Sequence, residues 1–142
     1  MTIAAILSGK GHDVVSITPT NTVMEATALL AKQRIGAVPV VEGGAVVGIF
    51  SERDVIHALN SGGTTALDGP VSAAMTAPAI TVGPSDSVLG ALSLMTRRRI
   101  RHLPVVADGA LVGFVSIGDL VKYRIDRIEA DAAAMRDYIQ SA

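Results

Sequence analysis

The chain has 142 residues, of which 49% are hydrophobic and 18% charged. This composition excludes an intrinsically disordered protein, because disorder needs low hydrophobicity and high net charge. Its 12 Lys and Arg residues nearly balance 13 Asp and Glu residues, so the positive excess typical of nucleic-acid and membrane-surface binders is missing. The sequence has no cysteine and no apolar run near the roughly 18 residues of a membrane span. We therefore expect a soluble cytoplasmic protein that binds neither membranes nor nucleic acid.

The first elements of the chain are predicted from hydrophobic pattern and capping residues. Residues 14–17 form a short β-branched run, which predicts a strand that ends before Pro19. Thr22 and Glu25 have the spacing of a capping box, so a helix is expected to begin there.

Two further strands and a second helix follow. Residues 37–41 and 45–50 are apolar runs separated by two glycines, a composition typical of a hairpin turn. Ser51 is predicted to cap a helix that runs to about Leu59. The order of elements is therefore β-α-β-β-α.

The same order returns in the second half of the chain, 65 residues later. Identical pairs at this offset include Pro39/Pro104, Val40/Val105, Gly48/Gly113, Ser51/Ser116 and Asp54/Asp119. Residues 3–7 resemble residues 71–75 at an offset of 68, which places about three extra residues near 9–11. A lone copy of about 60 residues is marginally stable, so we expect the two copies to pack around a pseudo-twofold axis. The predicted boundaries are repeat 1 at 8–60, a linker at 61–72, repeat 2 at 73–125 and a C-terminal amphipathic helix at 120–141.

The C-terminal segment departs from the repeat. Apolar residues recur there at alternating spacings of four and three, the pattern of a helix–helix seam: Val121, Ile125, Ile128, Ala132, Met135 and Ile139. Either this helix folds back on its own domain, or it packs against another subunit. Because it is about four turns longer than its counterpart in repeat 1, we favour a homodimer.

Motifs for catalysis are missing from the sequence. We find no nucleophile elbow, Walker A loop or dinucleotide-binding glycine fingerprint, and the three histidines lack the spacing of metal ligands. We therefore expect a protein that is not an enzyme and holds no metal.

A Ser-x-x-Asp motif ends a predicted strand in each repeat, at Ser51–Asp54 and at Ser116–Asp119. A single copy indicates only a helix N-cap. Two copies at equivalent places predict two helix N-termini beside a cleft, where free N–H groups favour a phosphate. The serine hydroxyl can donate to that phosphate, and the carboxylate can accept from two ribose hydroxyls. This combination favours a nucleotide over a bare anion, which the carboxylate would repel.

With the Ile-x-x-x-Pro-Val-Val strand that precedes each copy, these motifs resemble a tandem pair of CBS (cystathionine-β-synthase) domains, or Bateman module, of the stand-alone bacterial kind. The resemblance covers nearly the whole chain. It implies an α/β (α+β) fold with two pseudo-symmetric repeats. It also implies a sensor of energy or redox state that binds AMP, ADP or ATP, with NAD(H) or S-adenosylmethionine as alternatives, and regulates an unidentified protein. The other hypothesis is a ligand-independent assembly protein that acts through its C-terminal helix.

The resemblance further implies two ligand sites in the cleft between the repeats. The first combines Ser51, Arg53 and Asp54 with Ile80, Ile100, Arg101, His102 and Pro104. The second combines Ser116 and Asp119 with Val15, Ile35, Gly36, Ala37 and Pro39. We expect the first site to hold more phosphates, because charged donors make the stronger hydrogen bonds. Arg97 and Arg98 are predicted to be solvated residues at a helix C-terminus.

Overall fold

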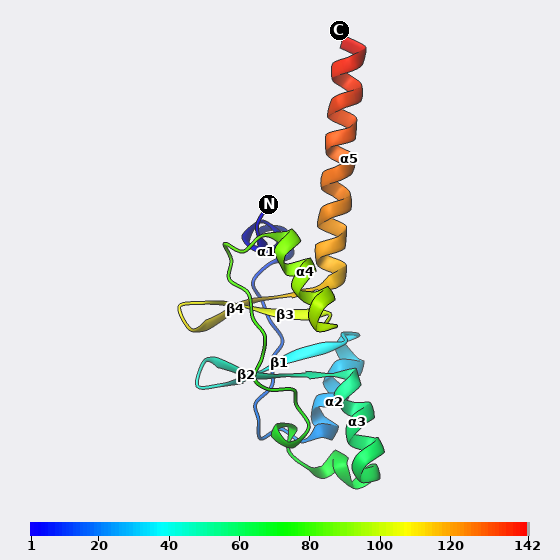
Figure 1. The fold of residues 1–142 in the computed structure, drawn as a ribbon. Coiled ribbons are helices and arrows are strands. Elements are labelled where there is room, and N and C mark those ends of the chain that lie inside the picture. Colours follow the sequence, from blue (N-terminus) through cyan, green and yellow to red (C-terminus); the bar gives the residue numbers. More distant parts are fainter. Residues whose placement is uncertain (142) are drawn as a thin grey trace.

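The computed structural model describes residues 1–141 and consists of two similar halves (Figure 1). The first half contains α2 (Val23–Gln33), β1 (Ala37–Glu42), β2 (Ala45–Ser51) and α3 (Glu52–Gly62). The second contains α4 (Val88–Arg98), β3 (His102–Ala107), β4 (Ala110–Ser116) and the start of α5 (Ile117–Ser141). Helix α1 (Ile3–Lys10) precedes them, and two 3-10 turns, Gly63–Asp68 and Val71–Ala73, connect the halves. This mixed fold with two antiparallel hairpins confirms the predicted fold class.

Short-range signals account for the ends of these elements. The Glu25 N–H donates to Thr22 Oγ1 over 3.0 Å, and the Glu25 carboxylate accepts from the Thr22 N–H over 3.3 Å, so the predicted capping box is complete. Hydrogen bonds from the backbone and the hydroxyl of Thr22 hold the pKa of Glu25 below its usual value. The hairpin turn places Gly43 and Gly44 at φ 60° and 81°, a left-handed conformation that glycine adopts without strain.

The strand predicted at residues 14–17 is shorter than expected, because prolines stop its pairing on both sides. Only Ile17 pairs, in parallel with β1: its N–H donates to Pro39 O over 3.1 Å, and its carbonyl accepts from Val41 N over 2.8 Å. The next parallel bonds would need an N–H from Pro39 on one side and from Pro19 on the other, and proline has none. In the second half Val82 pairs with β3 in the same single-residue way.

Each half receives part of its core from a segment that is distant in sequence. Ile3, Ile6 and Leu7 of α1 are buried in the second half, against α4 and β3, whereas Val71 is buried in the first. The chain then crosses from α1 to α2 in the other half (Figure 1). An added Cβ at Gly113 would lie 2.6 Å from the Leu7 side chain, so the absence of a side chain in β4 makes room for α1.

Helix α5 leaves the body of the molecule after its first turns. Leu120 is fully buried in the second half, and the rest of the helix extends away from both hairpins (Figure 1). Ile128 and Met135, in the middle of the predicted seam, are 52% and 59% exposed. The alternative in which this helix folds back on its own domain is therefore wrong. Within residues 1–141, no helix combines the length and the apolar character that crossing a membrane requires.

Candidate functional site

A cavity of about 870 Å³ lies where the two halves meet, and it collects most of the residues predicted from the sequence. Ten of the fifteen line it: Ile35, Gly36, Ala37, Ser51, Arg53, Asp54, Ile80, Ile100, Arg101 and His102. The sequence had assigned these residues to two separate sites. The structure places them around one cavity, which lies within the usual volume range of small-molecule sites.

Asp54 is held at the cavity wall by the motif that predicted it. Its Oδ2 accepts from the Ser51 N–H over 2.9 Å and from the Ser51 hydroxyl over 3.1 Å. Its Oδ1 accepts from the Thr76 hydroxyl over 3.0 Å. Asp54 is only 8% exposed, and three donors occupy most of the roughly four acceptor sites of its carboxylate. Two of these donors are hydroxyls, which can rotate toward another acceptor when a ligand donates instead. The arrangement fixes a carboxylate as an acceptor at the first turn of α3.

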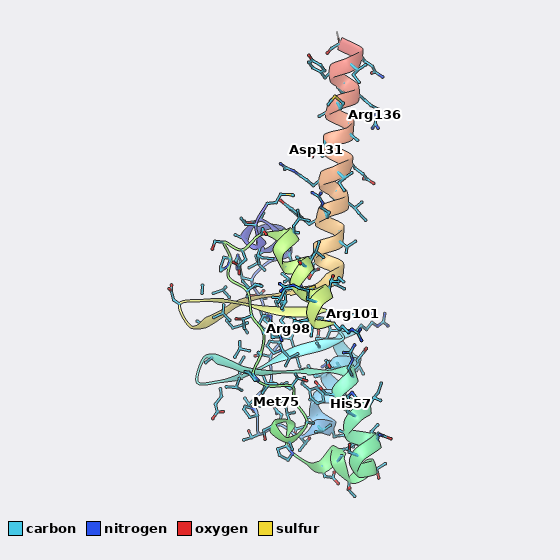
Figure 2. All side chains as sticks on the ribbon, in the orientation of Figure 1. His57, Met75, Arg98, Arg101, Asp131 and Arg136 are labelled. Carbon is cyan, nitrogen blue, oxygen red and sulfur yellow. The ribbon has the colours of Figure 1, made fainter. Side chains whose placement is uncertain are left out.

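Five arginines give the cavity a strongly positive wall. They are Arg34, Arg53, Arg98, Arg99 and Arg101, and Figure 2 shows Arg98 and Arg101 where the two halves meet. The guanidinium Nη1 of Arg53 donates to Arg99 O over 3.3 Å, which links α3 to the end of α4. Arg97 and Arg98 are both exposed in the last turn of α4, as predicted, and Arg98 also lines the cavity.

His102 lies on the second-half side of the cavity, stacked on Phe114 with ring centroids 5.6 Å apart. Its Cε1 lies 3.3 Å from where a Cβ would stand at Gly36, so the glycine in repeat 1 leaves room for the histidine of repeat 2. Burial lowers the pKa of His102; the positive charges of Lys10 and Arg101 act in the same direction, and the negative charges of Asp119 and Glu52 oppose them. The lowered pKa favours the neutral imidazole of His102.

This lowered pKa predicts a loss of stability in mild acid. Below about pH 6.5 the unfolded histidine binds a proton that the folded one resists, so the free energy of unfolding should decrease as the pH falls. His102→Gln should flatten this part of the profile. Urea unfolding across the pH range compares this variant with the wild type. An unchanged acid slope in His102→Gln would contradict the assignment.

Five predicted site residues lie outside the cavity lining, namely Val15, Pro39, Pro104, Ser116 and Asp119. Val15 is exposed. Pro39 and Pro104 are buried in β1 and β3, where their carbonyls accept from Ile17 and Val82. These two prolines therefore shape the strand that borders the cavity.

The second Ser-x-x-Asp motif forms its cap but has another partner. The Ser116 N–H donates to Asp119 Oδ2 over 2.8 Å, and the Asp119 N–H donates to Ser116 Oγ over 3.1 Å. Lys10 Nζ lies 2.5 Å from the same Oδ2. Burial acts to raise the pKa of Asp119, but hydrogen bonds from Lys10 and Ser116 outweigh it, so the net pKa is lowered.

Several residues of the site carried no clear signal in the sequence. Thr76 forms a hydrogen bond with Asp54, which is 22 positions away in the sequence. Lys10 forms one with Asp119, which is 109 positions away. The extra residues near 9–11 were the one available indication that repeat 1 differs at this place. The ends of strands and the starts of helices from both halves meet at the cavity. Its lining therefore also includes Ile49, Glu52, Ile56 and Ile117.

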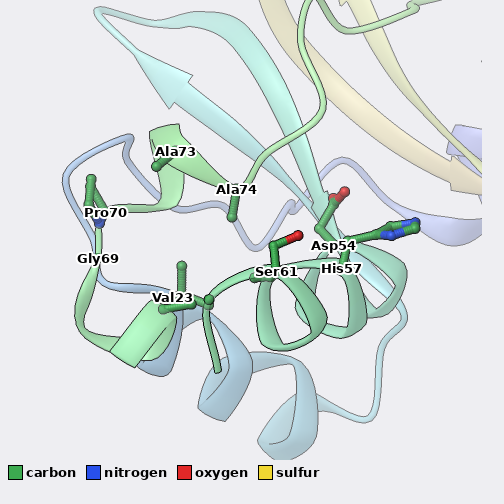
Figure 3. A pocket seen from close by; sticks show the side chains of 11 residues that line it. Val23, Asp54, His57, Ser61, Gly69, Pro70, Ala73 and Ala74 are labelled. Atoms are coloured by element: carbon green, nitrogen blue, oxygen red, sulfur yellow. The ribbon is translucent and has the colours of Figure 1, made fainter. Parts of the chain in front are cut away.

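A second, smaller cavity of about 380 Å³ lies on the other side of Asp54. Figure 3 shows Asp54, His57 and Ser61 on α3, with Pro70 and Ala74 on the neighbouring segment. Its remaining lining residues are glycine, alanine and valine, which offer few polar groups to orient a ligand. No group of three metal-ligating side chains occurs within the part of the chain that the structure describes.

Comparison with known proteins agrees with the two-repeat organisation. The family model for the CBS domain matches twice, at residues 11–61 and 71–126. The chain is 34% identical over 122 residues to the CBS domain-containing protein YhcV of Bacillus subtilis, covering 84% of this chain and 85% of YhcV. It also resembles the crystal structure of the CBS-domain protein ATU1752 from Agrobacterium tumefaciens. That match has a TM-score of 0.84 and 38% identity, and covers 87% of this chain and 99% of the other.

Two similar structures contain adenosyl ligands. PAE2072 from Pyrobaculum aerophilum, a CBS domain protein complexed with AMP, matches with a TM-score of 0.74 and 33% identity, over 84% of this chain and 89% of its own. The CBS domain pair of MJ0100, in complex with 5′-methylthioadenosine and S-adenosylmethionine, matches with a TM-score of 0.79 and 25% identity. That match covers 89% of this chain and 98% of the other.

Proposed function

The chain belongs to the CBS-domain family as a tandem pair of repeats, and from this premise we propose that it is a regulatory module that binds an adenine nucleotide in the cavity between its halves. AMP, ADP and ATP are the proposed ligands, and NAD(H) and S-adenosylmethionine share the adenosyl group that the site would recognise. The bound AMP and S-adenosylmethionine of the two similar structures support this ligand class.

The observation that carries the proposal is the chemistry of the 870 Å³ cavity. Isoleucines from both repeats, among them Ile35, Ile80 and Ile100, provide apolar surface for a planar base. Asp54 provides an acceptor for the two ribose hydroxyls. The five arginines of the wall provide charge-assisted donors for phosphates. The cavity thus offers a matching group to a base, a ribose and a phosphate chain. A bare anion or an apolar ligand would not use all three kinds of group.

The proposed mechanism is a shift of conformational populations. The wall of the cavity comes from both repeats, so a ligand that contacts both favours the arrangement in which these contacts fit best. Such a module needs no catalytic group of its own, and it would report the energy state of the cell to a partner protein through that change. We therefore place the protein among binding modules and not among enzymes.

A second candidate function rests on helix α5. Its exposed seam, from Val121 to Ile139, has the spacing of a helix–helix contact and points away from the body of the molecule. We propose that it pairs with the same helix of a second copy in a homodimer. If no adenosyl ligand binds, assembly through α5 becomes the preferred function.

Thermal unfolding with a nucleotide panel tests the proposed function. At a ligand concentration one hundred times the Kd, linkage adds about 2.7 kcal/mol of stability, which raises the Tm by several degrees for a domain of this size. We expect this increase with AMP, ADP and ATP and not with GMP or GTP. An unchanged Tm with every adenosyl compound at millimolar concentration would overturn the proposal, and mass spectrometry of ligand released from freshly purified protein would identify the natural compound.

A further inference from the structure

The two pseudo-equivalent carboxylates have different neighbours. Asp54 accepts a neutral hydrogen bond from the Thr76 hydroxyl over 3.0 Å. Asp119, at the same place in the second half, is paired with the ammonium group of Lys10, whose Nζ also donates to Phe114 O over 2.7 Å. One acceptor thus faces an uncharged donor, and the other is neutralised by a cation of the same chain.

This difference follows from the chain that runs beside each hairpin. In the first half, the backbone of Thr76 pairs with Ile49 of β2 by two hydrogen bonds of 2.9 Å. Beside β4, side chains take over that role, because Lys10 bonds the carbonyl of Phe114, and His12 Nδ1 lies 3.1 Å from the carbonyl of Val112. The extra residues near 9–11 thus place Lys10, the last residue of α1, above Asp119.

We propose that Lys10 occupies the position of the second ribose, so that the chain binds one adenosyl ligand, at Ser51 and Asp54, and Lys10 is the residue that sets this stoichiometry. The inference rests on the proposed function. A charge-assisted hydrogen bond is roughly twice as strong as a neutral one, so ribose hydroxyls compete poorly with an ammonium group for Asp119. A ligand that displaced Lys10 would also leave its charge without a partner.

The stoichiometry of binding tests the inference. Equilibrium dialysis with AMP, and separately with ATP, should give one ligand per chain for the wild type. Lys10→Met removes the charge and keeps most of the side-chain length, and it should give two. Lys32→Met removes a lysine from the exposed last turn of α2 and should still give one. The double variant Lys10→Met, Asp119→Ala should bind only one ligand per chain again, because it lacks the carboxylate of the second site.

The outcomes separate this inference from the proposed function. If the wild type binds neither AMP nor ATP, the proposed function fails. Two ligands per wild-type chain would overturn the inference and leave the proposed function standing. One ligand in a folded Lys10→Met would also overturn it. If that variant does not fold, Lys10→Gln, which keeps a polar donor near Phe114 O, makes the same comparison, and the wild-type stoichiometry decides independently of either variant.

Discussion

Asp54→Ala is expected to abolish detectable binding of adenine nucleotides. The substitution removes the acceptor that would take both ribose hydroxyls, and hydrogen bonds to a charged group contribute about 1.5–3 kcal/mol each. Two of them correspond to at least about a hundredfold increase in Kd. Calorimetric titration with AMP and with ATP measures the effect.

The matched control is Asp119→Ala, which removes the equivalent carboxylate from the other half. Because Lys10 already pairs with Asp119, this variant should bind the first ligand with nearly the wild-type Kd. Both changes remove the carboxylate at the third position of a helix cap, so thermal unfolding without ligand separates a loss of stability from a loss of affinity in each variant. Equal losses of affinity would show that the two carboxylates serve the ligand equally and would contradict the assignment of the site to Asp54.

The second large effect is expected at the α5 seam. Replacing Ile128 and Met135 with Glu places two charges on the proposed contact, and each occurs twice in a symmetric dimer. Burial of such a side chain contributes about 1.5–3 kcal/mol, so the four lost contacts together remove roughly 6–12 kcal/mol from the free energy of association. Light scattering should change from twice the chain mass to 14.6 kDa.

A control variant separates position from charge. Ala130 and Ala134 are exposed on α5 but lie off the seam, so Ala130→Glu with Ala134→Glu adds the same charge and should leave the dimer intact. A wild type that scatters as a monomer at micromolar concentration would contradict the dimer proposal. Nucleotide binding should survive in the Ile128→Glu, Met135→Glu variant, because the cavity lies between the two halves of one chain.

Local rules determined much of this molecule from sequence alone. The capping box at Thr22, the glycine turn at Gly43 and the Ser-x-x-Asp caps form as predicted, since each depends on residues no more than three positions apart. The repeat offset of 65 likewise identified two halves of equal fold, because equal patterns of apolar and turn residues select equal elements.

The arrangement of the site, in contrast, depends on contacts between segments that are distant in the sequence. The sequence divided the site residues between two ligand sites in one cleft, whereas the tertiary structure gathers ten of them around one cavity. Lys10 and Asp119 are 109 positions apart, and no local pattern connects them; they meet because α1 packs into the core of the second half. The burial of Ile3 and Leu7 there is a long-range hydrophobic contact that brings the end of α1 to Asp119, whereas Asp54 has the neutral Thr76 hydroxyl as its partner. This asymmetry therefore results from tertiary packing, because the extra residues near 9–11, which include Lys10, have no counterpart in the second repeat.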